Sequence, residues 1–224
     1  MARGLFVTGT GTEVGKTVVA ATIARTLAAE GQTVHVFKPA VTGLDEGVET
    51  DQTLLRRASG SSQSDEEIAP YRYGPPASPH LAAELAGEEI DPERLREAAH
   101  VAAAGADAIV CEGVGGLLVP LSPSYLVRDL AVDLGYPLVV VAGPGLGTIN
   151  HTLLTLEAAR AAGLEVAAVV LTPWPGEPTE IEASNRETIA TLGDVEVLTL
   201  PPINLGEPSA WPPLNPPTGR FRSV

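Results

Sequence analysis

Several features are scarce in this chain of 224 residues, and each shortage narrows what the protein can be. A single cysteine, Cys111, excludes an internal disulfide and fits a reducing compartment. Only 14 Lys and Arg stand against 28 Asp and Glu, so the net charge of −14 removes the usual attraction to nucleic acid and to anionic membranes. No apolar run approaches the ~20 residues that span a bilayer. We therefore expect a soluble, cytoplasmic protein whose partners are small molecules, with no nucleic acid and no membrane among them.

Lysine is almost absent. Twelve of the 14 basic residues are arginine, and the two lysines are Lys16 and Lys38. An ammonium group is a compact point charge, and the planar guanidinium of arginine does not replace it. Both lysines stand beside residues of recognisable motifs, so we predict that both are functional.

The hydrophobic pattern alternates between short β-branched runs and longer stretches of helical periodicity. This alternation predicts an α/β fold with a doubly wound, mostly parallel sheet and helices on both faces. The 44% hydrophobic content is enough for one continuous core, so we predict a single domain over residues 1–224. The predicted strands are 5–8, 33–37, 108–112, 138–141, 166–171 and 195–200. The predicted helices are 16–30, 51–58, 92–104, 126–134, 148–162 and 179–192.

Two segments interrupt this alternation. Residues 59–79 are rich in Ser and Pro and predict an irregular excursion that covers or borders a site. The tail, residues 201–224, holds seven prolines, and we expect it to be ordered only where it packs on the domain.

A glycine-rich turn joins the first predicted strand to the first predicted helix; it reads Gly9-Thr10-Gly11-Thr12-Glu13-Val14-Gly15-Lys16-Thr17. Glycines let backbone N–H groups face an anion, and the helix N-terminus adds positive potential. Lys16 would reach the outer phosphates of a nucleotide, and Thr17 would bind Mg²⁺. The strict phosphate-loop pattern places Gly at position 10, where this chain has Thr10. The strand–loop–helix context still predicts nucleotide binding and a P-loop NTPase-like domain.

Three further residues indicate what reaction the bound nucleotide takes part in. Glu112 ends a predicted strand and opens Gly113–Gly116, at the sheet edge where open α/β proteins bind ligands, so we predict a metal ligand. Asp51 begins a predicted helix and is either a second Mg²⁺ ligand or an ordinary helix-start aspartate. Lys38 follows the second predicted strand, where it would neutralise a transferring phosphoryl group or a carboxylated substrate.

Taken in order, these motifs resemble the dethiobiotin synthetase family of the biotin pathway. The resemblance rests on residues 8–17, Lys38-Pro39-x-x-Thr42-Gly43, Asp51, Pro79-His80, Glu112-Gly113-x-Gly115-Gly116 and Leu146-Gly147-Thr148-Ile149-Asn150-His151. It implies Mg²⁺- and ATP-dependent ring closure on 7,8-diaminononanoate. One amine takes up CO₂ as a carbamate, whose oxygen attacks the γ-phosphate. The second amine then displaces phosphate from the mixed anhydride and closes a cyclic urea.

The resemblance also implies roles for individual residues. Lys16 and Lys38 would be catalytic, and Thr17, Asp51 and Glu112 would hold Mg²⁺. The implied nucleotide contacts are Glu13, Val14, Gly15, Lys16, Thr17, Val18, Asp51, Glu112, Gly113, Val114, Gly115, Thr172, Pro173, Pro201, Pro202 and Ile203. The implied substrate contacts are Thr12, Thr42, Gly147, Ile149 and Asn150. The family binds the substrate carboxylate at a helix N-terminus of a neighbouring subunit, so we expect a homodimer with a shared site.

One pair of residues departs from the family. Thr172-Pro173 stands where the family usually has Asn-Asp, and neither residue can make the bidentate contact by which an amide recognises adenine. We predict relaxed base preference, with other nucleoside triphosphates usable beside ATP and with backbone groups or stacking by Trp174 as substitutes.

Two other functions fit a P-loop domain. One is a related amide-forming ligase, which is normally joined to a glutaminase domain for which this chain has no room. The other is a partitioning or regulatory ATPase. Proteins of that class usually carry a second lysine inside the phosphate loop and a basic surface, and neither appears in this sequence.

Overall fold

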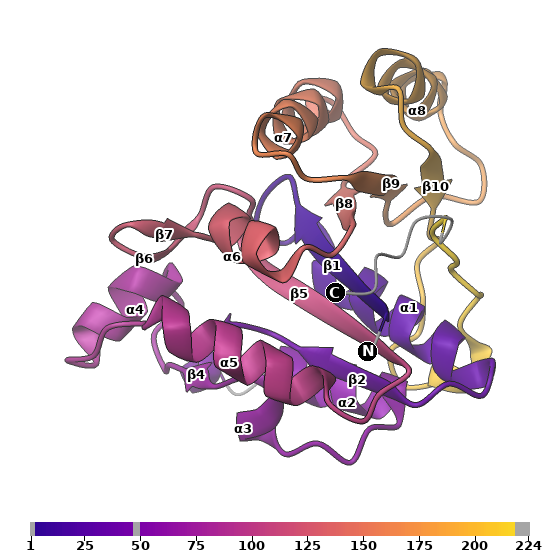
Figure 1. Cartoon of the computed structure of the whole chain (residues 1–224). Coiled ribbons are helices and arrows are strands. Elements are labelled where there is room, and N and C mark those ends of the chain that lie inside the picture. Colours follow the sequence, from indigo (N-terminus) through magenta and orange to yellow (C-terminus); the bar gives the residue numbers. More distant parts are fainter. Residues whose placement is uncertain (1–2, 47–49, 218–224) are drawn as a thin grey trace.

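A computed structural model describes residues 3–46 and 50–217 and places a six-stranded sheet at the centre of the molecule (Figure 1). The strand order is β10-β9-β8-β1-β5-β2, and every neighbouring pair is parallel. These strands are β1 Arg3–Gly9, β2 Val34–Phe37, β5 Ala108–Gly116, β8 Leu138–Ala142, β9 Val166–Leu171 and β10 Val197–Thr199. From β1 the chain leads to β2 at one edge, whereas from the neighbouring strand β5 it leads to β8 on the other side of β1. Ligands of open α/β sheets bind where neighbouring strands lead in opposite directions, here between β1 and β5.

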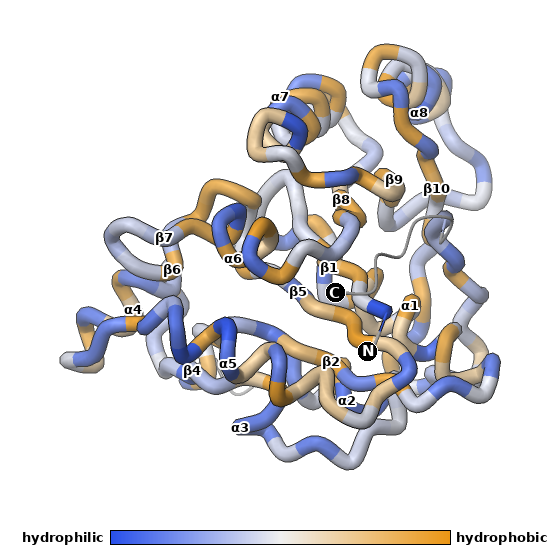
Figure 2. The backbone as a smooth tube through the Cα atoms, in the orientation of Figure 1, coloured by the Kyte–Doolittle hydropathy of each residue, from blue (hydrophilic) through white to orange (hydrophobic). Residues whose placement is uncertain are grey.

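Helices cover both faces of the sheet, as the alternating pattern predicts. They are α1 Lys16–Ala29, α2 Asp51–Ser59, α3 Asp65–Ile68, α4 Pro79–Leu85, α5 Pro92–Ala103, α6 Val127–Leu134, α7 Thr148–Ala161 and α8 Glu180–Gly193. Along β8, Val139 and Val141 belong to the apolar cluster that includes residues of α1 and α2, whereas Val140 and Ala142 belong to the cluster that includes residues of α7 and α8. Both faces of this strand are therefore buried, and Figure 2 shows the hydrophobic colour along β8 and β9. The predicted doubly wound α/β class is confirmed.

All predicted helices and strands are present. Most of their ends differ from the predicted bounds by one or two residues. The largest difference is β5, which continues through Gly116 although the predicted strand ends at Glu112. Gly113 permits this extension, because a Cβ there would lie 2.9 Å from Val127 Cγ1 and 3.1 Å from Phe6 Cε1. The strand thus passes the phosphate loop closely enough for Gly116 to pair with Gly9.

The segment 59–79 is more regular than predicted. It contains α3, whose N-terminus has a capping box formed by Ser64 and Glu67, and the short strand β4 Tyr71–Arg72. β4 pairs in parallel with β3 Ala40–Val41, beside the short 3-10 turn Leu44–Glu46. The hairpin of β6 Pro120–Ser122 and β7 Tyr125–Leu126 was also not predicted.

The Pro-rich tail runs back across α1 and α2 with one 3-10 turn at Pro208–Ala210. Trp211 and Leu214 are buried in the same apolar cluster as residues of these two helices. Residues 218–224, which the tail prediction includes, lie outside the described residues. Within residues 3–46 and 50–217, no helix has the length and apolar character needed to cross a bilayer.

Candidate functional site

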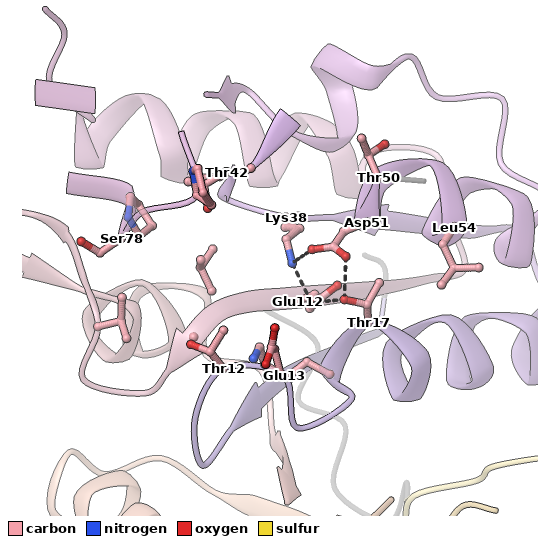
Figure 3. Close-up of a pocket in the computed structure, with 18 of the residues that line it drawn as sticks. Thr12, Glu13, Thr17, Lys38, Thr42, Thr50, Asp51, Leu54, Ser78 and Glu112 are labelled. Atoms are coloured by element: carbon pink, nitrogen blue, oxygen red, sulfur yellow. Dashed lines mark hydrogen bonds and ion pairs between the residues drawn. The ribbon is translucent and has the colours of Figure 1, made fainter. Parts of the chain in front are cut away.

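A cavity of about 930 Å³ lies where the carboxyl ends of β1, β2 and β5 meet. The phosphate loop, α1, α2, the end of β5 and residues 76–79 form its walls (Figure 3). Twelve sequence-predicted residues line it: Thr12, Glu13, Gly15, Lys16, Thr17, Val18, Lys38, Thr42, Asp51, Glu112, Val114 and Gly115. The fold therefore brings residues from the loop after the first predicted strand together with residues at the end of the third predicted strand.

The phosphate loop leaves the N-terminus of α1 open. Gly15 is the N-cap residue with φ 89°, and neither a side-chain cap nor an acidic residue occupies the first turn. Only glycine fits well at this position for two reasons. Its positive φ is unfavourable for other residues, and a Cβ would lie 2.8 Å from Thr172 Cγ2. Backbone N–H groups at an uncapped helix start, together with the helix dipole, favour an anion.

Lys16 folds back over this loop, and its Nζ donates to the Gly11 carbonyl at 2.8 Å. Burial lowers the pKa of Lys16, and the charge of Glu112 opposes that effect. A cation and the N–H groups of α1 thus face the same space, which is the chemistry that binds phosphate.

Four side chains, from α1, from the residue after β2, from α2 and from β5, form a network beyond the loop (Figure 3). Lys38 Nζ lies 2.6 Å from Glu112 Oε1 and 2.8 Å from Asp51 Oδ2. Thr17 Oγ1 lies 2.8 Å from Glu112 Oε1 and 3.0 Å from Asp51 Oδ1. The Glu112 side chain is fully buried, whereas that of Asp51 is 42% exposed, so the network opens to the cavity on the side of Asp51.

Electrostatics within the network favour the charged forms of Lys38 and Asp51. Burial alone would lower the pKa of Lys38, but the carboxylates of Glu112 and Asp51 outweigh it and raise that pKa. Burial disfavours the ionised form of Asp51, yet its contacts with Lys38 and Thr17 bring its pKa below the usual value. Burial raises the pKa of Glu112 against the opposing attraction of Lys38. Lys38 is therefore the cation around which the two acidic side chains are arranged.

The oxygen atoms of this network suit a hard divalent cation. Glu112 Oε2 is buried and has no hydrogen-bond partner, although a buried carboxylate oxygen normally has one. The Thr17 hydroxyl lies between both carboxylates but carries only one hydrogen, so it cannot donate to both at once. Among residues 3–46 and 50–217, no group of three or more His, Cys, Asp or Glu is arranged for a metal ion. A cation held here would need Thr17 and ligand oxygens beside the two carboxylates, which is the donor set that Mg²⁺ takes with phosphates.

Comparison with known proteins identifies the family. Residues 3–207 match the family model AAA_26, described as an AAA domain. The ATP-dependent dethiobiotin synthetase BioD of Anaeromyxobacter dehalogenans (strain 2CP-1 / ATCC BAA-258) is 46% identical over 200 residues, which cover 89% of this chain and 90% of that protein. The protein of the same name from Bacillus subtilis (strain 168) is 38% identical over 208 residues, covering 89% and 87%. The chain belongs to the dethiobiotin synthetase family.

The fold is shared more widely than the dethiobiotin synthetase sequence. A ParA family ATPase from Chlorobium tepidum TLS matches with a TM-score of 0.56 at 14% identity and covers 93% of this chain and 89% of its own. The septum site-determining protein MinD of Pyrococcus horikoshii OT3, solved with Mg-ADP, matches with a TM-score of 0.56 at 17% identity and covers 90% and 82%. These likenesses show the fold alone, whereas the extended sequence similarity lies with the dethiobiotin synthetases.

Ten predicted residues are not among those that line the cavity. Val14 packs on the apolar core, Gly113 lies against Phe6, and Thr172 is buried against Gly15. Pro173, Pro201 and Pro202 are exposed, and Ile203 packs on the core near α1. Gly147, Ile149 and Asn150 stand at the start of α7, which begins at Thr148 within the motif Leu146–His151.

The cavity also has walls formed by residues that were not among the predicted site residues. They are Ala40, Gly43, Thr50, Leu54, Pro76, Ala77, Ser78, Pro79, Val119 and Leu205. The Pro79-His80 motif and the prediction that segment 59–79 borders a site were signals for residues 76–79. Val119 and Leu205 had no such signal, because neither belongs to a motif and each reaches the cavity only through tertiary packing.

Proposed function

We propose that this protein converts 7,8-diaminononanoate and CO₂ to dethiobiotin at the expense of ATP. The observation that carries the proposal is the network of Thr17, Lys38, Asp51 and Glu112 beside an open phosphate loop. Membership of the dethiobiotin synthetase family supports the same substrates.

The phosphate loop and Lys16 would bind the triphosphate. Lys16 exchanges the Gly11 carbonyl, its present partner at 2.8 Å, for phosphate oxygens. Thr17, Asp51 and Glu112 would hold Mg²⁺, which when bound offsets the negative charge of the phosphates. The unpartnered Oε2 of Glu112 supports this assignment.

Lys38 would act at the point where the carbamate of the substrate meets the γ-phosphate of the nucleotide. Addition of CO₂ to one amine forms a carbamate and releases a proton. The carbamate oxygen attacks the γ-phosphorus, the bond to ADP breaks, and a mixed anhydride forms. The second amine then attacks the carbamoyl carbon, phosphate leaves, and the urea ring closes. A fixed ammonium at the Lys38 position stabilises the charge that develops on the carbamate and the phosphoryl group. Holding both amines near this centre supplies the orientation that ring closure needs.

We also propose that two subunits share each site. The residues predicted to contact the substrate carboxylate, including Gly147 and Asn150, do not line the cavity of their own chain. The start of α7 has no side-chain cap, and the preceding Leu146 is 97% exposed. An uncapped helix N-terminus suits a carboxylate. Mixing dimers that carry Lys16→Ala with dimers that carry Asn150→Ala should restore one intact site, and mixtures that recover no activity would contradict the shared site.

The nucleotide preference is proposed to be relaxed. The Thr172 N–H is already bonded to the Ala142 carbonyl at 3.0 Å, and the Trp174 N–H is bonded to Leu200 at 2.8 Å. Trp174 itself packs partly against the core beside α7 and α8. Few groups of this segment are left to read the edge of adenine, which supports the use of other nucleoside triphosphates. A cytoplasmic location is proposed as well, supported by the free, buried thiol of Cys111.

The deciding experiment measures phosphate release by the purified protein with Mg²⁺ and each of the four nucleoside triphosphates. Parallel reactions contain or omit 7,8-diaminononanoate and labelled bicarbonate. Release that depends on the diamine, with label in an acid-stable product, is the expected result. Hydrolysis that ignores the diamine with every nucleotide would overturn the proposal in favour of the amide ligase or the regulatory ATPase.

A further inference from the structure

Lys38 follows a strand at the edge of the sheet (Figure 1). β2 is the last strand in the sheet order, so it pairs with β5 on one side and its outer edge faces away from the other strands. Phe37 of β2 lies opposite Cys111 of β5, and the residues that follow these two are Lys38 and Glu112. A shift of β2 along β5 would therefore change the contact of 2.6 Å between Lys38 Nζ and Glu112 Oε1.

A glutamine side chain takes the place of a neighbouring strand on this outer edge. Gln63 Oε1 accepts the Val36 N–H at 2.8 Å, and Gln63 Nε2 donates to the Val36 carbonyl at 3.1 Å. One amide thus satisfies both backbone groups of a residue in an edge strand. Two residues further along, the Lys38 N–H donates to the Ile68 carbonyl at 2.8 Å. Gln63 precedes α3 and Ile68 ends it, so this short helix is bonded to β2 at two points next to Lys38.

The Gln63 amide is itself held in one orientation. Gln63 is 7% exposed, and its Oε1 also accepts a hydrogen bond from Ser61 Oγ at 2.9 Å. The Ser61 oxygen in turn accepts the Gln63 N–H at 3.1 Å. Because the single hydroxyl hydrogen of Ser61 points to the amide oxygen, the amide NH₂ group is left to face the Val36 carbonyl.

The segment that carries Gln63 also joins the elements of Lys38 and Asp51. Asp51 begins α2, and the chain passes from the end of α2 through Gln63 into α3. Arg56 of α2 forms an ion pair with Asp65 of α3. The same short segment therefore attaches the strand before Lys38 to the helix that carries one of its two carboxylate partners.

We propose that Gln63 is a positioning residue that holds the end of β2 and thereby keeps the Lys38 ammonium in its place between the two carboxylates. This inference rests on the proposed function, in which Lys38 stabilises charge on the carbamate and the phosphoryl group. Such stabilisation is effective when the charged group is fixed before the reaction begins. Gln63 is not among the residues that line the cavity, and its side chain bonds to Val36 and Ser61. Its effect on the reaction therefore passes through β2.

The proposal separates catalysis from nucleotide binding. The phosphate loop lies between β1 and α1, and Lys16 belongs to α1. The groups that face the phosphates are thus carried by elements other than β2. Loss of the Gln63 amide should lower kcat and leave KM for the nucleotide nearly unchanged, which is the signature of an interaction that acts in the transition state.

The test compares Gln63→Met with the wild-type protein. Methionine keeps the length of the side chain but offers neither the amide oxygen nor the amide NH₂ group to Val36. Dethiobiotin formation is measured with Mg²⁺, ATP, bicarbonate and 7,8-diaminononanoate. kcat should fall by roughly 5- to 20-fold, which is less than the ~100-fold that a misplacement of about 1 Å can cost. KM for ATP should stay within about twofold.

A double-variant cycle shows whether the effect passes through Lys38. In the Lys38→Met background no ammonium remains to be positioned, so adding Gln63→Met should change kcat by less than about twofold. A structural defect that reaches the site by another route would lower kcat by the same factor in both backgrounds.

Control variants separate positioning from loss of stability. Ser61→Ala removes only the hydroxyl that orients the Gln63 amide, and it should lower kcat by a smaller factor than Gln63→Met. Ser62→Ala removes the same group from the exposed neighbouring residue and should leave kcat unchanged. Ile189→Val and Ile189→Ala reduce a fully buried side chain that packs with β8, β9 and β10, so they should lose stability in urea unfolding and retain kcat.

The possible results decide between the two explanations. The inference would be overturned by an unchanged kcat in Gln63→Met, by equal losses in both backgrounds, or by the same loss in an Ile189 variant of matched stability. If Gln63→Met does not fold, equal kcat values for Ser61→Ala and Ser62→Ala would overturn it instead. A wild-type protein that forms no dethiobiotin would overturn the proposed function and the inference together. Dethiobiotin formation that is equally fast in the wild type and in Gln63→Met would overturn the inference alone.

Discussion

Replacing Lys38 by methionine removes the ammonium group that bonds directly to Glu112 and Asp51 while keeping a side chain of similar length. Glu112 is fully buried, so its charge would lose its partner at 2.6 Å without access to water. Removing one partner of a buried ion pair typically costs about 3–5 kcal/mol of unfolding free energy. Asp51 is 42% exposed and regains solvent, and the charge of Glu112 also acts on nearby Lys16. We therefore expect the lower end, about 3 kcal/mol.

The assay is urea unfolding followed by circular dichroism in EDTA, with thermal unfolding beside it. A loss of about 3 kcal/mol lowers Tm by roughly 6–12 °C for a chain of this size. The double variant Lys38→Met/Glu112→Gln removes both members of the pair and should be more stable than Lys38→Met alone. Mg²⁺ should stabilise Lys38→Met more than it stabilises the wild type, because it supplies the missing positive charge.

Two results would refute this reasoning. Lys38→Met could unfold at the wild-type urea concentration, in which case Lys38 does not compensate a buried charge. Alternatively, the double variant could be less stable than Lys38→Met, which would mean that packing and not charge governs the effect. Activity should fall by about 10²-fold or more in Lys38→Met, as for the loss of other groups that stabilise developing charge.

Other positions give independent tests. Gly15→Ala adds a Cβ at a residue with φ 89° and brings it to 2.8 Å from a neighbouring methyl group, so this variant should lose nucleotide binding. The control Gly31→Ala has a similar φ of 86° but no neighbour near its Cβ. It should only lower the free energy of unfolding, by about 1–2 kcal/mol in urea. Burial raises the pKa of the Cys111 thiol, so Ellman's reagent should label it only after denaturation; rapid labelling of the native protein would contradict its burial. Burial raises the pKa of Tyr73 and of Tyr136 to about 12, so the unfolded chain loses these protons first and stability should fall as pH rises above about 10. Absorbance at 295 nm checks this, since two tyrosines ionising with ordinary pKa values in the native protein would refute it.

Much of the fold was predictable because its core strands are continuous apolar runs. β9 has the predicted bounds 166–171, and the convergence of Lys38 and Glu112 follows from the rule that parallel strands end at one edge of a sheet. The extension of β5 was not predictable, because Gly113 reads as a turn residue unless its packing against Phe6 and Val127 is known.

The site was predictable in its residues but not in its contacts. The order of the motifs predicted Thr17 and Asp51, which are 34 positions apart, as site residues. No sequence pattern predicts that the Thr17 hydroxyl lies between the carboxylates of Asp51 and Glu112. Leu205 could not be found at all. Its position depends on Arg57, 148 residues away, and side-chain contacts over such separations leave no periodic trace in the sequence.

The hydrogen bond from Leu214 to Thr26 joins residues 188 positions apart, near opposite ends of the chain. Synthesis proceeds from the N-terminus, so α1 and the phosphate loop exist long before Leu214 can reach them. A nascent or truncated chain that ends before residue 204 contains every predicted catalytic group but lacks the Leu205 wall of its cavity. The cavity therefore gains its Leu205 wall only after synthesis has passed residue 205.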